Sequence, residues 1–214
     1  RRFLIENALH WIHEYHADGL RLDATHALVD KGPTPFLRVL TTAVHAAREP
    51  RPLVFAEDER NLATIVKAVE DQGWGADGVW ADDFHHVVRR MLAGDSHGYY
   101  VDYAQRPLWM LGRALAEGFV FQGEASASRD GALRGEPSAH LSGTAFVSFL
   151  QTHDQVGNRA LGERLEVLAS PTALRAATAI WLLAPHIPML FMGEEFGAST
   201  PFLFFCDFGS DLAK

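Results

Sequence analysis

The feature that most constrains the fold is a regular alternation of short apolar runs with longer amphipathic segments. In the first such segment, Leu4, Ala8, Trp11 and Ile12 recur at the spacing of one face of an α-helix. The short runs, bounded by Gly, Pro or polar residues, have the length and composition of buried strands. The predicted strands are residues 19–23, 53–57, 78–81, 145–152 and 187–192, and the predicted helices are residues 3–15, 36–48, 62–72, 84–92, 108–117 and 171–183.

Strands that alternate with helices predict a parallel α/β sheet, either doubly wound or closed into a (β/α)8 TIM barrel. The polar residues favour the barrel, because a barrel gathers the carboxyl ends of its strands into one ring. No Gly-rich turn follows a strand to hold a dinucleotide phosphate, which weakens the doubly wound alternative. Ionisable residues end four of the five predicted strands: Asp23, Glu57, Asp82 with Asp83, and His153 with Asp154.

Five strands are fewer than the eight that a closed barrel needs. We therefore expect residues 1–214 to form one partial barrel domain, the C-terminal part with about strands four to eight. The opening at Arg1 and Arg2, without Met and close to a predicted helix, also indicates a fragment. Residues 94–143 break the alternation with Gly- and Ser-rich loops around one helical piece, so we expect an insertion there that carries function or binds a partner.

The composition excludes several classes of function. With 214 residues, 48% of them hydrophobic, the chain is long enough to bury a core as one domain. A net charge of −8 argues against a nucleic-acid or anionic membrane partner. The apolar runs are too short to cross a bilayer, and Cys206 is the only cysteine, so no internal disulfide forms. These features favour a reducing, cytoplasmic location.

Residues 19–24 alternate apolar and polar side chains, which places Arg21 and Asp23 on one face of the first predicted strand. Two residues of strand separate them by roughly 6–7 Å, within reach of a guanidinium group. Burying both charges is costly unless they compensate each other. The pair therefore indicates either a site that uses the carboxylate or an ion pair that only holds neighbouring strands together.

Three carboxylates stand at predicted strand ends: Asp23, Glu57 and Asp154. Glycoside hydrolysis needs one carboxylate as nucleophile and one carboxylic acid to protonate the departing oxygen. Arg21 would keep Asp23 ionised as a nucleophile, whereas the apolar run before Glu57 would raise its pKa and suit it to the acid role. His153 and Asp154 could bind ring hydroxyls and stabilise charge in the transition state.

The residues alone leave two alternatives open. Acidic strand ends also bind metals, although from His85 and His86 we expect substrate contacts or helix capping rather than metal ligation. Glu59 is a rival for the acid role, because a strand continued past Glu57 would carry both side chains on one face. We predict no metal and no cofactor.

Three stretches resemble the second, third and fourth sequence signatures of the α-amylase family: residues 19–24, 55–57 and 149–155. They occur in the family's order, on what would be its fourth, fifth and seventh barrel strands, and the resemblance covers essentially the whole chain. The family's first signature is absent, as expected if the chain begins after it.

The resemblance implies a retaining glycoside hydrolase, and it assigns a role to each matching position. Asp23 matches the nucleophile, Glu57 the acid/base and Asp154 the stabiliser of the transition state. Arg21 and His153 match positions that orient the substrate. The choice of Glu57 rather than Glu59 as the acid depends on this family pattern.

Four further runs resemble the hydrolases of this family that release trehalose: residues 80–86, 151–158, 191–197 and 201–205. The implied substrate is maltooligosyltrehalose or a related α-glucan, cleaved at the α-1,4 bond next to the terminal trehalose. Glu194 is expected to support the site or a sugar subsite. Other substrate contacts are expected from strand-end and loop groups, namely His26, Asp82, Asp83, His85, Gln155 and Asn158.

Two other functions remain possible within the same fold. A glycogen branching enzyme shares the barrel and the carboxylates, but residues 57–60 (Glu-Asp-Glu-Arg) and 152–155 (Thr-His-Asp-Gln) depart from its usual Glu-Glu-Ser-Thr and Ser-His-Asp-Glu. A catalytically silent binding subunit usually lacks one or more of the three carboxylates, and all three are present here.

Overall fold

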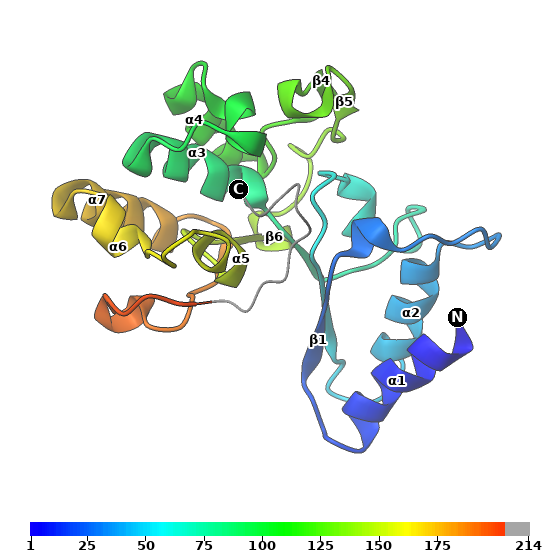
Figure 1. Ribbon diagram of the computed structural model, residues 1–214. Coiled ribbons are helices and arrows are strands. Elements are labelled where there is room, and N and C mark those ends of the chain that lie inside the picture. Colours follow the sequence, from blue (N-terminus) through cyan, green and yellow to red (C-terminus); the bar gives the residue numbers. More distant parts are fainter. Residues whose placement is uncertain (204–214) are drawn as a thin grey trace.

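The computed structural model describes residues 1–203, in which five parallel strands form one open sheet (Figure 1). The sheet order is β1-β2-β3-β6-β7, so the predicted strands are confirmed in number and direction. Each strand ends before its predicted last residue, and the strands are β1 (Gly19–Leu22), β2 (Leu53–Ala56), β3 (Gly78–Trp80), β6 (Phe146–Ser148) and β7 (Ile187–Pro188).

Because all five strands run in the same direction, their carboxyl ends meet at one edge of the sheet. Leu22 pairs with Ala56, which places the residues that follow β1 and β2 side by side. The ladder continues past the strands, since the Glu57 N–H donates to the Leu22 carbonyl at 3.0 Å and the Thr25 N–H to the Glu57 carbonyl at 2.9 Å. The register therefore brings Asp23 and Glu57 together.

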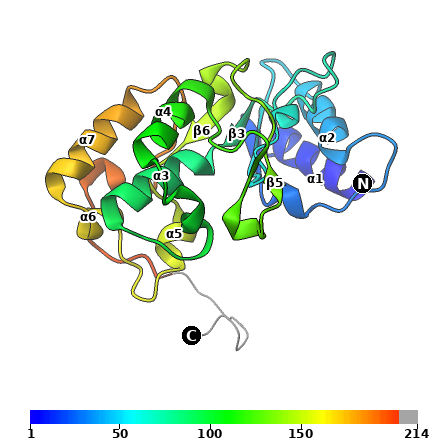
Figure 2. The same cartoon turned by 90° about the horizontal axis from the view of Figure 1, so that it is seen from above.

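Helices cover one face of the sheet in two groups, and both views separate the groups clearly (Figures 1 and 2). Near β1 lie α1 (Arg2–His13) and α2 (Phe36–His45), whose Ile12 and Val44 pack on Val54. The second group lies over β6, where the indole N–H of Trp181 donates to the Ser148 carbonyl at 3.0 Å. It consists of α3 (Asp82–Ala93), α4 (Pro107–Glu117), α6 (Leu165–Leu168) and α7 (Pro171–Leu182).

The other face of the sheet has a small apolar cluster of its own. Trp80, Val147 and Phe149 are buried there, and Phe55 and Ile187 pack against them. All of them except Phe149 line an apolar hollow of about 530 Å³. Among residues 1–203 the sheet stays open at β1 and β7, so the closed eight-stranded barrel remains a prediction from the resemblance.

The helices of the structure differ from the predicted ones in three ways. No α-helix forms over residues 62–72, which hold only the 3₁₀ turn η2 (Ala63–Ile65), because the chain folds back and the Trp74 N–H donates to the Thr64 carbonyl. Two short helices were missed, α5 (His153–Gly157) and α6. The start of α3 lies two residues before the predicted one, so Asp82 and Asp83 belong to its first turn.

The predicted insertion lies between α3 and β6 and packs mainly on α3. It contains α4, which agrees with the predicted helix to within one residue. Its remaining elements are η3 (Gly98–Tyr103), β4 (Glu124–Ala125), η4 (Ala127–Arg129) and the antiparallel partner of β4, β5 (Leu133–Arg134). The other 3₁₀ turns of the described chain are η1 (Thr25–Ala27), η5 (Gly143–Ala145) and η6 (Glu194–Phe196).

None of the helices described over residues 1–203 combines the length and the apolar composition that a bilayer crossing requires. Cys206 and the last two residues of the 201–205 run lie outside the described residues.

Gly118, in the insertion, packs against Phe146 of β6, and its replacement should lower the stability of the fold. It follows α4 with a φ of +82°, and a Cβ placed there would lie 2.2 Å from the Phe146 ring. We expect Gly118→Ala to lower the free energy of unfolding by about 2–4 kcal/mol, from overpacking plus the left-handed backbone. Gly112→Ala is the matched control, because Gly112 lies inside α4 with nothing within 4 Å of its Cβ position, and it should raise stability by about 0.5–1 kcal/mol. Denaturant unfolding of both variants checks this, and equal effects would contradict it.

Candidate active site

A polar cleft of about 620 Å³ opens at the carboxyl end of the sheet. It collects side chains that follow β1, β2, β3 and β6 together with side chains of the insertion. The residues that line it are His26, Glu57, Glu59, Trp80, Asp82, His86, Gly98, Tyr99, Ser128, Arg129, Arg134, Asp154, Gln155 and Asn158.

Arg21 connects the two carboxylates that follow β1 and β2. Its Nη1 lies 2.6 Å from Asp23 Oδ1, and its Nη2 lies 2.6 Å from Glu57 Oε2. The guanidinium carbon stands 4.4 Å from the centre of the Trp80 ring, which supports the cation from β3. The predicted contact between Arg21 and Asp23 is thus confirmed. Because one guanidinium binds both groups, Asp23 and Glu57 lie within a few ångström of each other.

Glu57 has a partly buried environment that favours its protonated form. Its Oε2 accepts a hydrogen bond from the Ala24 N–H at 2.9 Å, and Ala24 has a left-handed backbone with φ of +42°. Partial burial raises the pKa of Glu57 above its ordinary value, and the neighbouring Asp23 adds to this, although the Ala24 N–H and Arg21 oppose it. The raised pKa was predicted from the apolar run before Glu57, and the direction is confirmed.

Asp23 differs from Glu57 in exposure. Its side chain is 76% exposed, whereas that of Glu57 is 19% exposed. The carboxylate of Asp23 is therefore largely open to solvent, whereas that of Glu57 lies partly in the protein at the wall of the cleft. This is the kind of contrast that separates the roles of two neighbouring carboxyl groups.

Asp154 enters the cleft from the first turn of α5. Thr152 caps this helix, and Gln155 Oε1 accepts hydrogen bonds from the backbone N–H and the hydroxyl of Thr152. His153 Nε2 lies 3.5 Å from Asp154 Oδ1. Both side chains are partly exposed, and His153 borders the apolar hollow near Arg21. Gln155 lines the cleft, but its carbonyl oxygen already serves the helix cap.

Asp82 forms part of the cleft wall and has an unusual environment. Burial is the main cause that raises its pKa to about 7; Arg134 opposes this rise, and the nearby Asp83, Glu57 and Glu59 contribute to it. Near neutral pH the carboxyl group can therefore donate or accept a hydrogen bond. His26, a predicted substrate contact, is exposed at the same cleft, as is Asn158.

Two of the predicted substrate contacts lie behind the cleft instead. Asp83 is fully buried, and backbone N–H groups of Val120 and Phe121 donate to its Oδ2. His85 is also fully buried, with Nδ1 bonded to the Leu150 carbonyl at 2.6 Å and Nε2 3.2 Å from the Tyr100 hydroxyl. The cause is the phase of α3, which starts at Asp82 and turns the neighbouring residue His86 toward the cleft.

The insertion supplies cleft residues that sequence reasoning missed. Arg129 pairs with Glu59 at 3.0 Å, and Ser128 lies beside it in the cleft wall. Asp102 fixes this wall, because it accepts hydrogen bonds from the hydroxyls of Ser126 and Ser128. The signal in the sequence was weak: four arginines in the predicted insertion of a chain with a net negative charge.

Glu194 lies apart from the cleft. Its carboxylate accepts from the Phe191 N–H at 2.6 Å and from the Gln151 amide at 3.1 Å, and Gln151 also reaches Glu166. Burial raises the pKa of Glu194 to about 7, although those hydrogen bonds oppose it. The group supports the segment after β7. Across residues 1–203, no three potential His, Cys, Asp or Glu ligands gather where one metal ion could be held.

Several known proteins are similar to the chain in sequence. No protein-family profile matches the chain. The malto-oligosyltrehalose trehalohydrolase of Saccharolobus solfataricus is 39% identical over 97% of the chain, and that of Arthrobacter ramosus is 41% identical over 96%. In both cases the chain spans only 36% of the relative's length. A 1,4-alpha-glucan branching enzyme of Myxococcus xanthus is 28% identical over 92% of the chain and 26% of its own length.

Solved structures agree with the fold. A Salmonella typhimurium structure with a provisional α-amylase assignment matches the whole chain with a TM-score of 0.91 and 44% identity, and the match covers 37% of that protein. The Nostoc punctiforme debranching enzyme matches 94% of the chain, and 38% of its own, with a TM-score of 0.61 at 17% identity. The second likeness concerns the fold alone.

A parallel sheet with paired carboxylates at its carboxyl edge, together with these relatives, defines the class: the chain belongs to the α-amylase family of glycoside hydrolases. Within that family it is related to the malto-oligosyltrehalose trehalohydrolases.

Proposed function

We propose that the protein carrying this chain is a retaining glycoside hydrolase that cleaves the α-1,4 bond next to the terminal trehalose of maltooligosyltrehalose. The observation that supports this most directly is the Arg21 bridge between Asp23 and Glu57. Retaining enzymes need two carboxyl groups only about 5–5.5 Å apart, so that one can attack the anomeric carbon while the other protonates the leaving oxygen.

In the proposed first step, the exposed carboxylate of Asp23 attacks the anomeric carbon and forms a covalent glycosyl ester. Glu57 gives its proton to the departing glycosidic oxygen, which leaves as the trehalose hydroxyl. Its raised pKa suits this donation. Arg21 orients both groups, and Asp154 on α5 faces the same cleft, where its charge would stabilise an oxocarbenium-like transition state.

In the second step, water replaces the departed trehalose and attacks the anomeric carbon of the ester. Glu57, now ionised, accepts a proton from this water, and the Asp23 carboxylate is released. The products are free trehalose and a maltooligosaccharide. No cofactor takes part in either step.

The substrate class is supported by relatives rather than by a bound ligand. Several relatives at about 40% identity are malto-oligosyltrehalose trehalohydrolases. The cleft offers hydrogen-bonding groups of the kind that discriminate among sugar hydroxyls, including His26, Asp82 and Asn158. We also propose that residues 1–214 contain strands four to eight of a (β/α)8 barrel. The proposed location of the protein is cytoplasmic.

The test is a product profile from three substrates, with the protein at its natural length. We expect trehalose to be released from maltooligosyltrehalose much faster than a maltooligosaccharide of equal length is cleaved, because the leaving side must recognise the trehalose unit. Amylose should gain no branch points. Chromatography of the products would give equal cleavage of the first two substrates for an ordinary amylase, and new α-1,6 linkages for a branching enzyme.

A further inference from the structure

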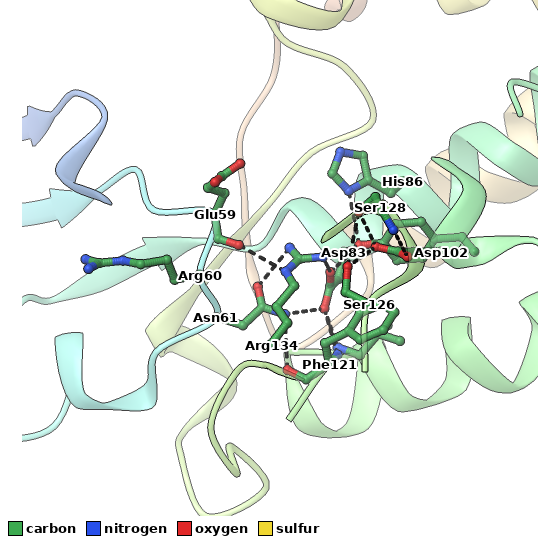
Figure 3. Close-up of polar contacts among 12 residues, drawn as sticks. Glu59, Arg60, Asn61, Asp83, His86, Asp102, Phe121, Ser126, Ser128 and Arg134 are labelled. Carbon is green, nitrogen blue, oxygen red and sulfur yellow. Dashed lines mark hydrogen bonds and ion pairs between the residues drawn. The ribbon is translucent and has the colours of Figure 1, made fainter. Parts of the chain in front are cut away.

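A buried arginine of the insertion, Arg134 on β5, binds three other segments at once (Figure 3). Its side chain is 4% exposed. Nε donates to the Glu59 carbonyl at 3.1 Å, and Nη2 donates to Asn61 Oδ1 at 3.3 Å. Nη1 donates to the Tyr103 hydroxyl at 2.8 Å and lies 3.2 Å from Asp83 Oδ1.

The partner of this cation is saturated by other donors. Asp83 Oδ1 accepts from the Tyr103 hydroxyl, and Oδ2 accepts from the Asn61 amide at 2.7 Å. The Asn61 amide also reaches the Phe121 carbonyl at 3.2 Å. A buried carboxylate and guanidinium are tolerated only when such hydrogen bonds satisfy the remaining atoms. The side chains of Arg134, Asp83, Asn61 and Tyr103 are therefore linked to one another by hydrogen bonds.

Each segment that Arg134 binds also carries a different residue of the cleft wall. The segment after β2 carries Glu59, whose side chain pairs with Arg129. The first turn of α3 carries Asp82 next to Asp83, and η3 carries Tyr99 in the same short helix as Tyr103. The reacting carboxyl groups, by contrast, are held from β1 and do not contact this network.

We propose that Arg134 is a positioning residue for substrate binding, which fixes the segments bearing Glu59, Asp82 and Tyr99 relative to one another. This role rests on the proposed glycoside hydrolysis. It depends on the several N–H donors that the guanidinium group holds in fixed directions, and not on its positive charge alone. Lysine keeps the charge but places one donor group where arginine directs several.

The test is Arg134→Lys, measured in the protein at its natural length. Lysine still compensates Asp83, so the variant should fold. We expect KM for maltooligosyltrehalose to rise roughly tenfold with kcat within about twofold of the unmodified protein, because binding contacts shift while Asp23 and Glu57 stay in place. The Kd of maltoheptaose, measured by calorimetry, should rise to a similar extent.

Arg89→Lys is the matched control. Arg89 is a fully buried arginine of α3 whose Nε bonds Asp95, and it lies outside the cleft. It should lower the melting temperature as much as Arg134→Lys does, without changing KM.

The outcomes separate the two proposals. Unchanged KM and Kd in Arg134→Lys would show that only the charge matters and would overturn the positioning role, as would an equal rise in Arg89→Lys. If the unmodified protein binds maltoheptaose but does not cleave maltooligosyltrehalose, the proposed function fails, and the two Kd values still decide the role of Arg134. Absence of both maltoheptaose binding and maltooligosyltrehalose cleavage in the unmodified protein would overturn both.

Discussion

Replacing Asp23 with asparagine is expected to lower kcat by about 10⁴–10⁶-fold, the range seen when a catalytic nucleophile is removed. Asparagine has the same shape but cannot form the glycosyl ester, so the first covalent step is lost. Because Asp23 is 76% exposed and contacts Arg21, the change should disturb neither the sheet nor the cleft wall. Steady-state kinetics on maltooligosyltrehalose measures the effect, and KM should change little.

Asp18→Asn serves as the control for this substitution. Asp18 precedes β1, its side chain is 96% exposed, and it pairs only at the surface with Arg48. Such pairs contribute little, so kcat should stay near that of the unmodified protein. A higher KM with a near-normal kcat in Asp23→Asn would contradict the assignment of Asp23 as the nucleophile.

Glu57→Gln should lower kcat by about 10²–10⁴-fold, the usual contribution of a positioned acid or base. The acid must be protonated to work, and its pKa is raised, so activity should fall as pH rises through that pKa. This alkaline limb of the pH profile should disappear in the variant. A maltosyl fluoride, whose leaving group needs no proton, should recover much of the lost rate in the first step.

Glu59→Gln is the control for the acid role. Glu59 is 54% exposed and paired with Arg129 at 3.0 Å, whereas Glu57 is more buried and lies beside Asp23. Glu59→Gln should therefore be far milder and keep the alkaline limb. Loss of that limb in Glu59→Gln, with its retention in Glu57→Gln, would exchange the two roles.

The sheet and the centre of the site were predictable from local sequence. Short apolar runs bounded by Gly, Pro or polar residues indicated the strands, and the alternation of Arg21 with apolar residues placed its side chain beside Asp23. The raised pKa of Glu57 followed from the apolar run before it. The contact between Arg21 and Asp23 needs only neighbouring residues, whereas that between Arg21 and Glu57 depends on the parallel pairing of β1 with β2.

The cleft wall depends on contacts that local sequence does not encode. His85 and His86 are neighbours on α3 and point in different directions, so only His86 reaches the cleft, and Asp83 is buried. Residues 62–72 do not form the predicted helix, because long-range hydrogen bonds, such as those from Thr64 to Glu136, hold them in another conformation. Arg134 and Glu59 are separated by 75 residues, so no periodicity could have paired them. By contrast, the cap of α5 had a readable signal, Thr152 followed three residues later by Gln155.

The pairing of Leu22 with Ala56 has an evolutionary consequence. Backbone register fixes where the Cα atoms of Asp23 and Glu57 stand, so under the proposed mechanism most side-chain exchanges delete one carboxyl group rather than set the pair at the about 6.5–9.5 Å of inverting enzymes. A one-residue slip of β1 or β2 would not help, because it would turn every side chain of that strand to the wrong face. Under that mechanism, the sugars that related chains accept can therefore change more readily than the anomeric configuration of their products.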